Sequence, residues 1–388
     1  MLHQAATRLM SRANLQVPIG KPRQVLAGLA SYTGPWQSQR CRQLSEPAQG
    51  DLFLTNKRLL FLSEPEIFVI RPLRLGWCLL ALLLTLAIGC GSNSSGSAPS
   101  PLSSTYVMAA GDLPAALKQP GVVLLSAQSK LEISAPGFVN NAVPVDVDAV
   151  TAFGQVPGAF GNYRGWASLF GALGITGAQT VIIYDDGELK FASRVRFLMA
   201  YFGVTQSYIV NGGYNALLPL IQQGLLTMTS PAVPTPAAFT VNILDSPIHL
   251  VFEQDVAAVL DDPAVALVDV RTPAEFDGCL LLPGITRGGH IPGARNLPVE
   301  NLLTPQQGVP NFSFLDPPLE LLGLFQNFGL SQDQKIIVYC QDGAKSSLVA
   351  TALVDAGYSN VSLYYLSYLD WQDVPSNPVA SISPCTGS

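Results

Sequence analysis

The sequence predicts an α/β protein of two similar domains, each a parallel β-sheet flanked by helices. Short apolar runs alternate with helical segments, as expected for parallel strands that are covered on both faces. Two sequence motifs recur at nearly the same separation, which indicates an internal duplication. A chain of 388 residues is long enough for two domains with separate cores.

The second half contains the clearest succession of elements. Residues 264–270 (AVALVDV) and 335–340 (KIIVYC) are short, continuous apolar runs typical of buried strands. A helix is predicted from Ser346, at a pair of serines, to Gly357, where a glycine ends it. Residues 360–367 (NVSLYYLS) return as a strand. Strand, helix and strand in this order predict parallel pairing.

The first half repeats this pattern. Residues 181–203 (VIIYDDGELKFASRVRFLMAYFG) have the same strand, polar loop, helix and terminal glycine as residues 336–357 (IIVYCQDGAKSSLVATALVDAG), with their tyrosines 155 residues apart. Residues 137–146 (GFVNNAVPVD) likewise resemble residues 289–299 (GHIPGARNLPV), 152 residues further along. The nearly equal offsets favour a duplicated domain.

Composition predicts where these domains begin and end. Residues 91–105 form a low-complexity tether rich in serine, glycine and proline, and residues 227–245 contain a Pro/Ala/Thr-rich linker that cannot form its own core. We therefore expect a first domain over residues 106–226 and a second over residues 246–388.

An apolar segment precedes the tether at residues 71–90. Arg71 and Arg74 form a basic start, an apolar run follows, and small residues stand before Cys90, which are the three parts of a secretory signal. Because a cysteine follows directly, the segment resembles a bacterial lipoprotein signal, in which Cys90 is lipidated and becomes the mature N-terminus. That resemblance implies a protein of the bacterial cell envelope, lipid-anchored to a membrane and facing the periplasm or the exterior.

Two questions about this region stay open. An ordinary membrane-spanning helix is an alternative to the lipoprotein signal, although the apolar run is about 15 residues, shorter than the ~20 that a bilayer span needs. Residues 1–70 are either a real cytosolic segment or precede a true translation start near Val69. Within them, residues 50–63 resemble a strand pair of a GRAM or PH-like domain.

Charge and histidine content argue against two classes of partner. Residues 1–90 hold ten Lys+Arg against four Asp+Glu, whereas residues 91–388 hold eleven against twenty-three. The larger part is acidic, so no nucleic-acid partner is expected. Three histidines and the lack of a C-x-x-C motif argue against a metal site, and we expect no cofactor.

Four stretches of the second half together resemble a rhodanese domain: LVDVRTPAEFDG, GHIPGA, YCQDGAKS and YYLSYLDW. From about Ala115 to Trp371, the two halves resemble a tandem-domain sulfurtransferase of the thiosulfate or 3-mercaptopyruvate type. The resemblance implies that a sulfane sulfur passes from a small anionic donor, through a persulfide on Cys340, to cyanide or a thiol acceptor. We expect the protein to be a monomer.

The loop after Cys340 suits this chemistry on physical grounds, because it lies between the end of a parallel strand and the start of a helix. The backbone N–H groups expected to surround the sulfur and its substrate belong to Gln341, Asp342, Gly343, Ala344, Lys345 and Ser346. Such donors lower the pKa of a thiol and hold a persulfide anion. Gly343 allows a tight turn, and Lys345 adds a cation at the rim.

Asp342 opposes part of this effect. A carboxylate within several ångströms of the sulfur repels a dianion such as thiosulfate and raises the pKa of the thiol. Loops of the thiosulfate type are rich in positive charge and loops of the 3-mercaptopyruvate type are small and neutral, whereas this loop has Asp342 beside Lys345. Tyr365 and Leu366 also stand where the family usually has Asp-Gly. The sulfur donor and the acceptor therefore stay open.

Three other interpretations of Cys340 compete with sulfur transfer. In the first, Cys340 is an inert cysteine buried at a strand end, as many free cysteines are. In the second, it belongs to a non-catalytic rhodanese-fold binding module at the cell envelope, which Asp342 and the altered first half suggest. In the third, it serves an oxyanion-processing phosphatase or reductase, although those loops need an arginine six positions after the cysteine, where this chain has Ser346.

The first half lacks the nucleophile. Asp185 stands in place of the cysteine, and Phe138 stands where the second half has His290. We therefore expect this half to be a structural and substrate-side partner. Its FASRV stretch resembles the family's segment that sends an arginine across the domain cleft, which would make Arg194 a clamp for an anionic substrate. Arg196 is expected to be a solvated helix charge.

The remaining residues singled out are assigned to the framework. His290 in GHIPGA is interpreted as a residue that maintains the fold, and Asp269 and Arg271 are expected to bond within the same framework. Cys279 and Cys385 suit a disulfide in an oxidising compartment. The alternative is that Cys279 acts on Cys340 as a resolving thiol.

Overall fold

A computed structural model of the chain describes residues 105–128, 137–243, 246–309 and 312–381. The predictions for residues 1–70, for the signal segment with Cys90, and for Cys385 lie outside these residues. Both predicted domains belong to one compact unit, Gly91–Ser388. Within the described ranges, no helix is long and apolar enough to cross a membrane.

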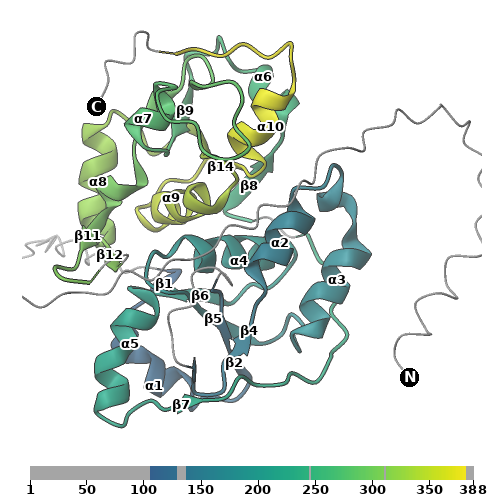
Figure 1. Cartoon of the computed structure of the whole chain (residues 1–388), viewed down its shortest axis with the longest axis vertical. Helices are drawn as coiled ribbons and strands as arrows, with labels where there is room; N and C mark the ends of the chain where they lie inside the picture. Colours follow the sequence, from purple (N-terminus) through teal and green to yellow (C-terminus); the bar gives the residue numbers. More distant parts are fainter. Residues whose placement is uncertain (1–104, 129–136, 244–245, 310–311, 382–388) are drawn as a thin grey trace, which may run out of the picture. The chain divides into compact units, whose positions relative to one another are not determined.

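The first half contains a five-stranded parallel sheet with the strand order β1-β6-β5-β2-β4 (Figure 1). Its strands are β1 (Val107–Met108), β2 (Val122–Ser126), β4 (Val143–Pro144), β5 (Thr180–Tyr184) and β6 (Ser207–Val210). Its helices are η1 (Ala110–Asp112), α1 (Leu113–Ala116), α2 (Val147–Gly154), η2 (Ala159–Gly161), α3 (Tyr163–Ala172), α4 (Lys190–Tyr201) and α5 (Gly213–Gln222).

The second half contains another five-stranded parallel sheet, with the order β10-β9-β13-β14-β8. Its strands are β8 (Ile248–Val251), β9 (Val265–Asp269), β10 (Arg295–Asn296), β13 (Lys335–Tyr339) and β14 (Val361–Tyr364). Its helices are α6 (Glu253–Ala257), α7 (Pro273–Phe276), η3 (Val299–Leu302), α8 (Pro318–Asn327), α9 (Ala344–Asp355) and α10 (Ser367–Asp373). A short antiparallel pair, β11 (Leu303–Pro305) and β12 (Ser313–Leu315), lies between η3 and α8 in the chain.

The two sheets have the same connectivity. In each, the first strand in the chain lies at one edge and is followed across the sheet by the fifth, fourth, second and third strands. Because every pairing within these sheets is parallel, each connection is a crossover rather than a hairpin, and most of these crossovers contain helices, as in an α/β fold. The predicted α/β fold, with parallel sheets flanked by helices, is confirmed.

The central strand of the second sheet shows why these residues form buried strands. Ile336, Ile337, Val338 and Tyr339 of β13 are all 0% exposed, so both faces of the strand are covered. β-Branched and aromatic side chains fit this pleated, buried surface. Full burial of an aliphatic side chain of this size contributes about 1.5–3 kcal/mol, so this strand is a major part of the core.

Helices α4 and α9 pack against each other and join the two halves. Eight of the twelve residues of α4 and ten of the twelve residues of α9 are buried. A helix buried on nearly all sides must be covered by more than its own sheet. Each of these two helices is therefore covered by its own sheet on one side and by the other helix on another.

The linker predicted over residues 227–245 is an ordered part of the first half. Its start forms β7 (Met228–Thr229), which pairs antiparallel with β3 (Phe138–Val139). Further along, the Ala237 N–H donates to the Gly171 carbonyl over 2.9 Å, and Phe239 is buried against Phe170. The linker has no core of its own, but it contributes Phe239 to the core of the first half.

Two predicted boundaries in the second half are wrong by a few residues. Helix α9 begins at Ala344 rather than Ser346, because Gly343 is already its N-cap. The strand predicted over residues 360–367 ends at Tyr364, since Ser367 has φ of 61° and its hydroxyl donates to the Tyr364 carbonyl at the start of α10. Both shifts bring polar groups of these turns next to Cys340.

Candidate active site around Cys340

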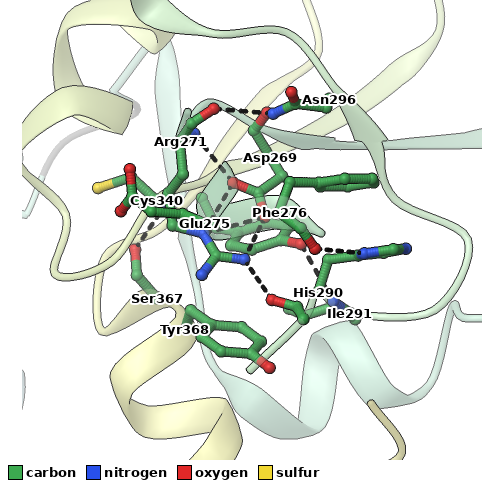
Figure 2. Close-up of polar contacts among 12 residues, drawn as sticks. Asp269, Arg271, Glu275, Phe276, His290, Ile291, Asn296, Cys340, Ser367 and Tyr368 are labelled. Carbon is green, nitrogen blue, oxygen red and sulfur yellow. Dashed lines mark hydrogen bonds and ion pairs between the residues drawn. The ribbon is translucent and has the colours of Figure 1, made fainter. Parts of the chain in front are cut away.

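Cys340 lies directly after β13 and four residues before the first residue of α9. It is a free thiol and is 1% exposed. Its backbone N–H donates to the Ser367 hydroxyl over 3.2 Å (Figure 2), and its carbonyl accepts from the Tyr368 N–H over 3.1 Å. The start of α10 therefore fixes the backbone from which the sulfur projects.

Two hydrogen-bond donors point at the Cys340 sulfur. The Gly343 N–H lies 3.1 Å from Sγ, and the Ser346 hydroxyl oxygen lies 3.4 Å from it. Both belong to the first turn of α9 or its cap, where the helix dipole adds positive potential. This arrangement stabilises negative charge on sulfur.

The backbone at Gly343 explains why the turn needs glycine. Its φ is 96°, in the left-handed region, and a Cβ built there would lie 2.4 Å from the Tyr365 carbonyl oxygen. Any other residue would therefore strain the backbone and collide with the segment before α10. The predicted role of Gly343 in a tight turn is confirmed.

Asp342 and Arg194 form an ion pair between the two halves. An Arg194 Nη2 atom from α4 lies 2.8 Å from the Asp342 carboxylate and also 2.8 Å from the Asp342 carbonyl oxygen. The Thr151 hydroxyl accepts from Arg194 Nη1, and Gln155 Nε2 donates to the same Asp342 carbonyl over 3.0 Å. Arg194 thus reaches the cysteine loop, as the sequence predicted, but its charge is paired with a residue of that loop.

Electrostatics reinforce this pair. Burial acts to raise the pKa of the Asp342 carboxyl, but the Arg194 charge outweighs burial and lowers that pKa below its ordinary value. Burial acts to lower the pKa of Arg194, whereas the neighbouring acidic groups of Tyr365 and Asp342 raise it. Asp342 and Arg194 therefore both stay charged near neutral pH.

The other loop residues turn toward other partners. Gln341 Nε2 donates to the Pro283 carbonyl over 3.1 Å, and Lys345 Nζ lies 3.1 Å from Glu300 Oε1. Ala344 is 5% exposed, and its N–H lies 3.4 Å from the Asp342 carboxylate. The expectation that all the backbone N–H groups from Gln341 to Ser346 surround the sulfur was too broad, because in the described part of the chain only the Gly343 N–H contacts it directly.

A cavity of about 400 Å³ lies beside this loop, between the starts of α4 and α9. Its charged lining consists of Glu188, Lys190, Glu300 and Lys345, and its apolar lining includes Val299 and Leu348. The cavity combines two cations with two anions.

Asp185 holds the equivalent place in the first half, directly after β5. Its Oδ1 accepts from the N–H groups of Gly187 and Leu189 at 3.0 and 3.1 Å, and its Oδ2 accepts from those of Phe191 and Ala192 at 3.2 Å each. Burial, and then the charge of Asp186, raise the pKa of Asp185 to about 7, although these hydrogen bonds act to lower it. The loop still presents N–H donors, but a carboxylate occupies them.

The framework residues behave as the sequence predicted (Figure 2). Arg271 Nη2 lies 2.6 Å from the Asp269 carboxylate and donates to the Gly289 carbonyl over 2.8 Å. His290 Nδ1 lies 2.8 Å from the Phe276 carbonyl, and the two rings stack with centroids 3.6 Å apart. The contacts of His290 are those of a structural residue.

The structure overturns the role expected for Arg196 and decides between the two roles considered for Cys279. Arg196 is not a solvated helix charge: it is 2% exposed, its guanidinium lies 3.7 Å from the centroid of the Tyr106 ring, and burial lowers its pKa to about 10. Cys279 is disulfide-bonded, which leaves no thiol there to act on Cys340. The partner of Cys279 lies outside the described residues.

Several site residues had no signal in the sequence. Thr151 of α2 holds Arg194, and Gln155, which directly follows α2, holds the Asp342 carbonyl; both lie far from the two motifs in the chain. Glu300 belongs to η3, and Ser367 was assigned to a strand. Only the three-dimensional packing brings these four residues to the cysteine loop.

Comparisons with known proteins match both the fold and the sequence. Residues 253–374 match the Rhodanese-like domain family. The 3-mercaptopyruvate sulfurtransferase of Escherichia coli is 29% identical over 249 residues, covering 63% of this chain and 84% of the relative. A relative of the thiosulfate sulfurtransferase type from Haloferax volcanii is 32% identical over 217 residues, covering 54% and 72%. The crystal structure of SseA from Escherichia coli superposes with a TM-score of 0.54 at 25% identity, covering 68% of this chain and 99% of SseA.

Proposed function

The chain belongs to the rhodanese family of sulfurtransferases, and on that premise we propose that it carries sulfane sulfur on Cys340. The donor is a small molecule such as thiosulfate or 3-mercaptopyruvate, and the acceptor is cyanide or a thiol. The observation that carries the proposal is the pair of donors on Sγ: the Gly343 N–H at 3.1 Å and the Ser346 hydroxyl at 3.4 Å, at the positive end of α9.

The reaction takes two displacements at sulfur. In the first, the Cys340 thiolate attacks the sulfane sulfur of the donor, a new S–S bond forms, and the leaving group departs with the electron pair of the broken bond. Thiosulfate releases sulfite, and 3-mercaptopyruvate releases the enolate of pyruvate. In the second, cyanide or a thiolate attacks the outer sulfur, the S–S bond breaks, and the Cys340 thiolate returns.

The loop donors stabilise each anionic form in this cycle. The Ser346 hydroxyl and Gly343 N–H bind the resting thiolate, and the positive end of α9 favours the persulfide anion. No general base close to Cys340 is required, because the nucleophile reacts as an anion and the leaving groups depart as anions.

We also propose that the chain is a tandem duplication, with domains over residues 106–226 and 246–388, in which only the second is catalytic. The identical strand order of the two sheets supports this division. Asp185 has no thiol that could accept a sulfane sulfur. The first domain therefore contributes structure and, through Arg194, a positive charge at the catalytic loop.

The proposed location is the bacterial cell envelope, with the protein anchored by lipid on Cys90 and facing the periplasm or the exterior. The support is the sequence of residues 71–90, with its basic start, apolar run and small residues before the cysteine. Mass spectrometry of the mature N-terminal peptide tests this: an acylated Cys90 is expected, and an intact peptide that continues through position 90 would contradict it.

A thiocyanate assay tests the proposed activity. The purified full chain is incubated with cyanide and one sulfur donor at a time: thiosulfate, 3-mercaptopyruvate or cysteine hydropersulfide. A Cys340→Ser variant is assayed in the same way. Thiocyanate formation with at least one donor, absent from the variant, is expected. Equal, background rates in both proteins with every donor would favour the non-catalytic binding module.

A further inference from the structure

The cation best placed to bind an anionic donor is already occupied. Arg194 is 1% exposed, and its Nη2 contacts both the carboxylate and the carbonyl oxygen of Asp342 at 2.8 Å. Its Nη1 donates to Thr151. A sulfonate or carboxylate that used this guanidinium would have to displace the Asp342 carboxylate first.

The same carboxylate lies close to the reacting atom. Asp342 Oδ1 is 4.0 Å from Cys340 Sγ. Its side chain is 35% exposed, so its charge faces the approach to the loop rather than lying wholly buried. An incoming dianion meets this negative charge at short range, whereas a donor with a compensating positive charge does not.

The adjacent cavity has charges of both signs. Lys190 and Lys345 line it together with Glu188 and Glu300, and each lysine is ion-paired with one of the glutamates, so the charged lining sums to zero. Lys190 also acts electrostatically on Asp342 and helps to lower the pKa of its carboxyl. A ligand with one ammonium and one carboxylate group adds no net charge to this lining, while thiosulfate brings two negative charges toward Asp342 and a cavity whose cations are already paired.

We propose that Asp342 is a specificity-determining residue: by pairing with Arg194 it disfavours dianionic donors and selects a zwitterionic, amino-acid-type persulfide. This inference rests on the proposed sulfur transfer through Cys340. In the first step the Cys340 thiolate attacks the outer sulfur of the donor R–S–SH. The bond between the two donor sulfurs breaks, the R–S⁻ thiolate leaves with its electron pair, and Cys340 becomes Cys–S–SH.

The experiment compares sulfur loading of the full chain from thiosulfate and from cysteine hydropersulfide, followed by intact mass. Asp342→Asn keeps the shape of the side chain and removes its charge. It is expected to raise the rate constant for loading from thiosulfate at least about tenfold and to change the rate constant for cysteine hydropersulfide by less than about threefold. Asp333→Asn, the same chemical change at an exposed loop residue, is expected to alter neither.

A double variant separates the charge of Arg194 from a general loosening of the loop. Arg194→Gln combined with Asp342→Asn removes both charges and leaves no unpaired buried cation. It is expected to lose the gain toward thiosulfate, because the freed guanidinium is what binds the donor. A double variant that loads from thiosulfate as fast as Asp342→Asn would overturn the proposal.

The unsubstituted chain provides a measurement that does not depend on folding of the variants. Its ratio of loading rates, cysteine hydropersulfide over thiosulfate, is expected to exceed the same ratio for free cysteine as the attacking thiol. An equal or smaller ratio overturns the selectivity of Asp342 while leaving sulfur transfer intact. Loading from neither donor, with the Cys340 thiol shown to be free, overturns the proposed function itself.

Discussion

Asp185 and Cys340 occupy equivalent places in the two halves. Each follows the fourth strand of its parallel sheet in chain order, β5 or β13, and each side chain accepts N–H hydrogen bonds from the loop that leads into a twelve-residue helix. In one half the accepting atom is a carboxylate oxygen, and in the other it is sulfur. The same anion-binding turn thus serves a structural role in one half and a proposed catalytic role in the other.

The Asp185 carboxyl is expected to make stability depend on pH. Its pKa is raised from 3.8 to about 7, so the folded chain retains this proton over a range in which the unfolded chain has lost it. Stability should therefore fall as pH rises from about 4 to about 7, by about 1.4 kcal/mol per unit of pKa difference.

The variant Asp185→Asn, which cannot ionise, isolates this effect. The free energy of unfolding of the unsubstituted chain, minus that of Asp185→Asn, should decline between pH 5 and pH 7 in urea titrations. The same difference taken with the matched Asp333→Asn variant, at an exposed site, should stay constant between pH 5 and pH 7. A difference that stays constant over this range would rule out titration of Asp185.

Removal of the hydroxyl at Ser346 should slow sulfur loading. The Ser346 hydroxyl lies 3.4 Å from Cys340 Sγ, and a hydrogen bond to a charged group is worth about 1.5–3 kcal/mol. Ser346→Ala should therefore load sulfur at least about tenfold more slowly in a mass-based time course, while Ser359→Ala, at an exposed position, should load at the normal rate. Equal rates for both variants would show that the hydroxyl has no part in the reaction.

A methyl group at Gly343 should disrupt the loop. The left-handed backbone costs an alanine about 1–2 kcal/mol, and the Cβ would lie 2.4 Å from the Tyr365 carbonyl oxygen, which adds a collision. Gly121→Ala is the matched control, because Gly121 also has positive φ but has open space around it. Urea unfolding should show a larger loss for Gly343→Ala than for Gly121→Ala; equal losses would mean that the loop relaxes around the methyl group.

The start of the described chain should be coupled energetically to α4. The buried Arg196 guanidinium lies 3.7 Å from the centroid of the half-buried Tyr106 ring, and a desolvated cation–π contact is worth about 2 kcal/mol. A double-mutant cycle with Arg196→Met and Tyr106→Leu should give a coupling of about 1–2 kcal/mol in free energy of unfolding. The Arg295–Phe328 pair, in which the arginine is exposed, should give a smaller coupling in the same experiment. Additive effects at Arg196 and Tyr106 would contradict this contact.

Local patterns predicted the fold well because strand and helix signals are local. Conformational preferences of residues close together in the chain explain the apolar run over β13 and the glycine that ends α9. The same preferences explain the repeat of both features in the first half. The sequence failed where three-dimensional packing decides. Arg196 resembles any charged helix residue, and only the packing of α4 against α9 buries it.

The site was predicted in outline and not in its charge pairing. Cys340, Gly343 and Arg194 were identified from the loop and from a family resemblance, and these residues do come together. The pairing of Arg194 with Asp342 could not be predicted, because no spacing in the chain relates two residues 148 positions apart.

The most direct test of the account is to locate the sulfur. The full chain is loaded with each donor, its intact mass is measured, and peptide mapping without reductant assigns the added mass, with Cys340→Ser as the control. The account predicts the gain of a single sulfur atom on the peptide that contains Cys340, with no gain in the control. A chain that gains no sulfur while its Cys340 thiol is free, or that gains it only on another cysteine, would contradict the account.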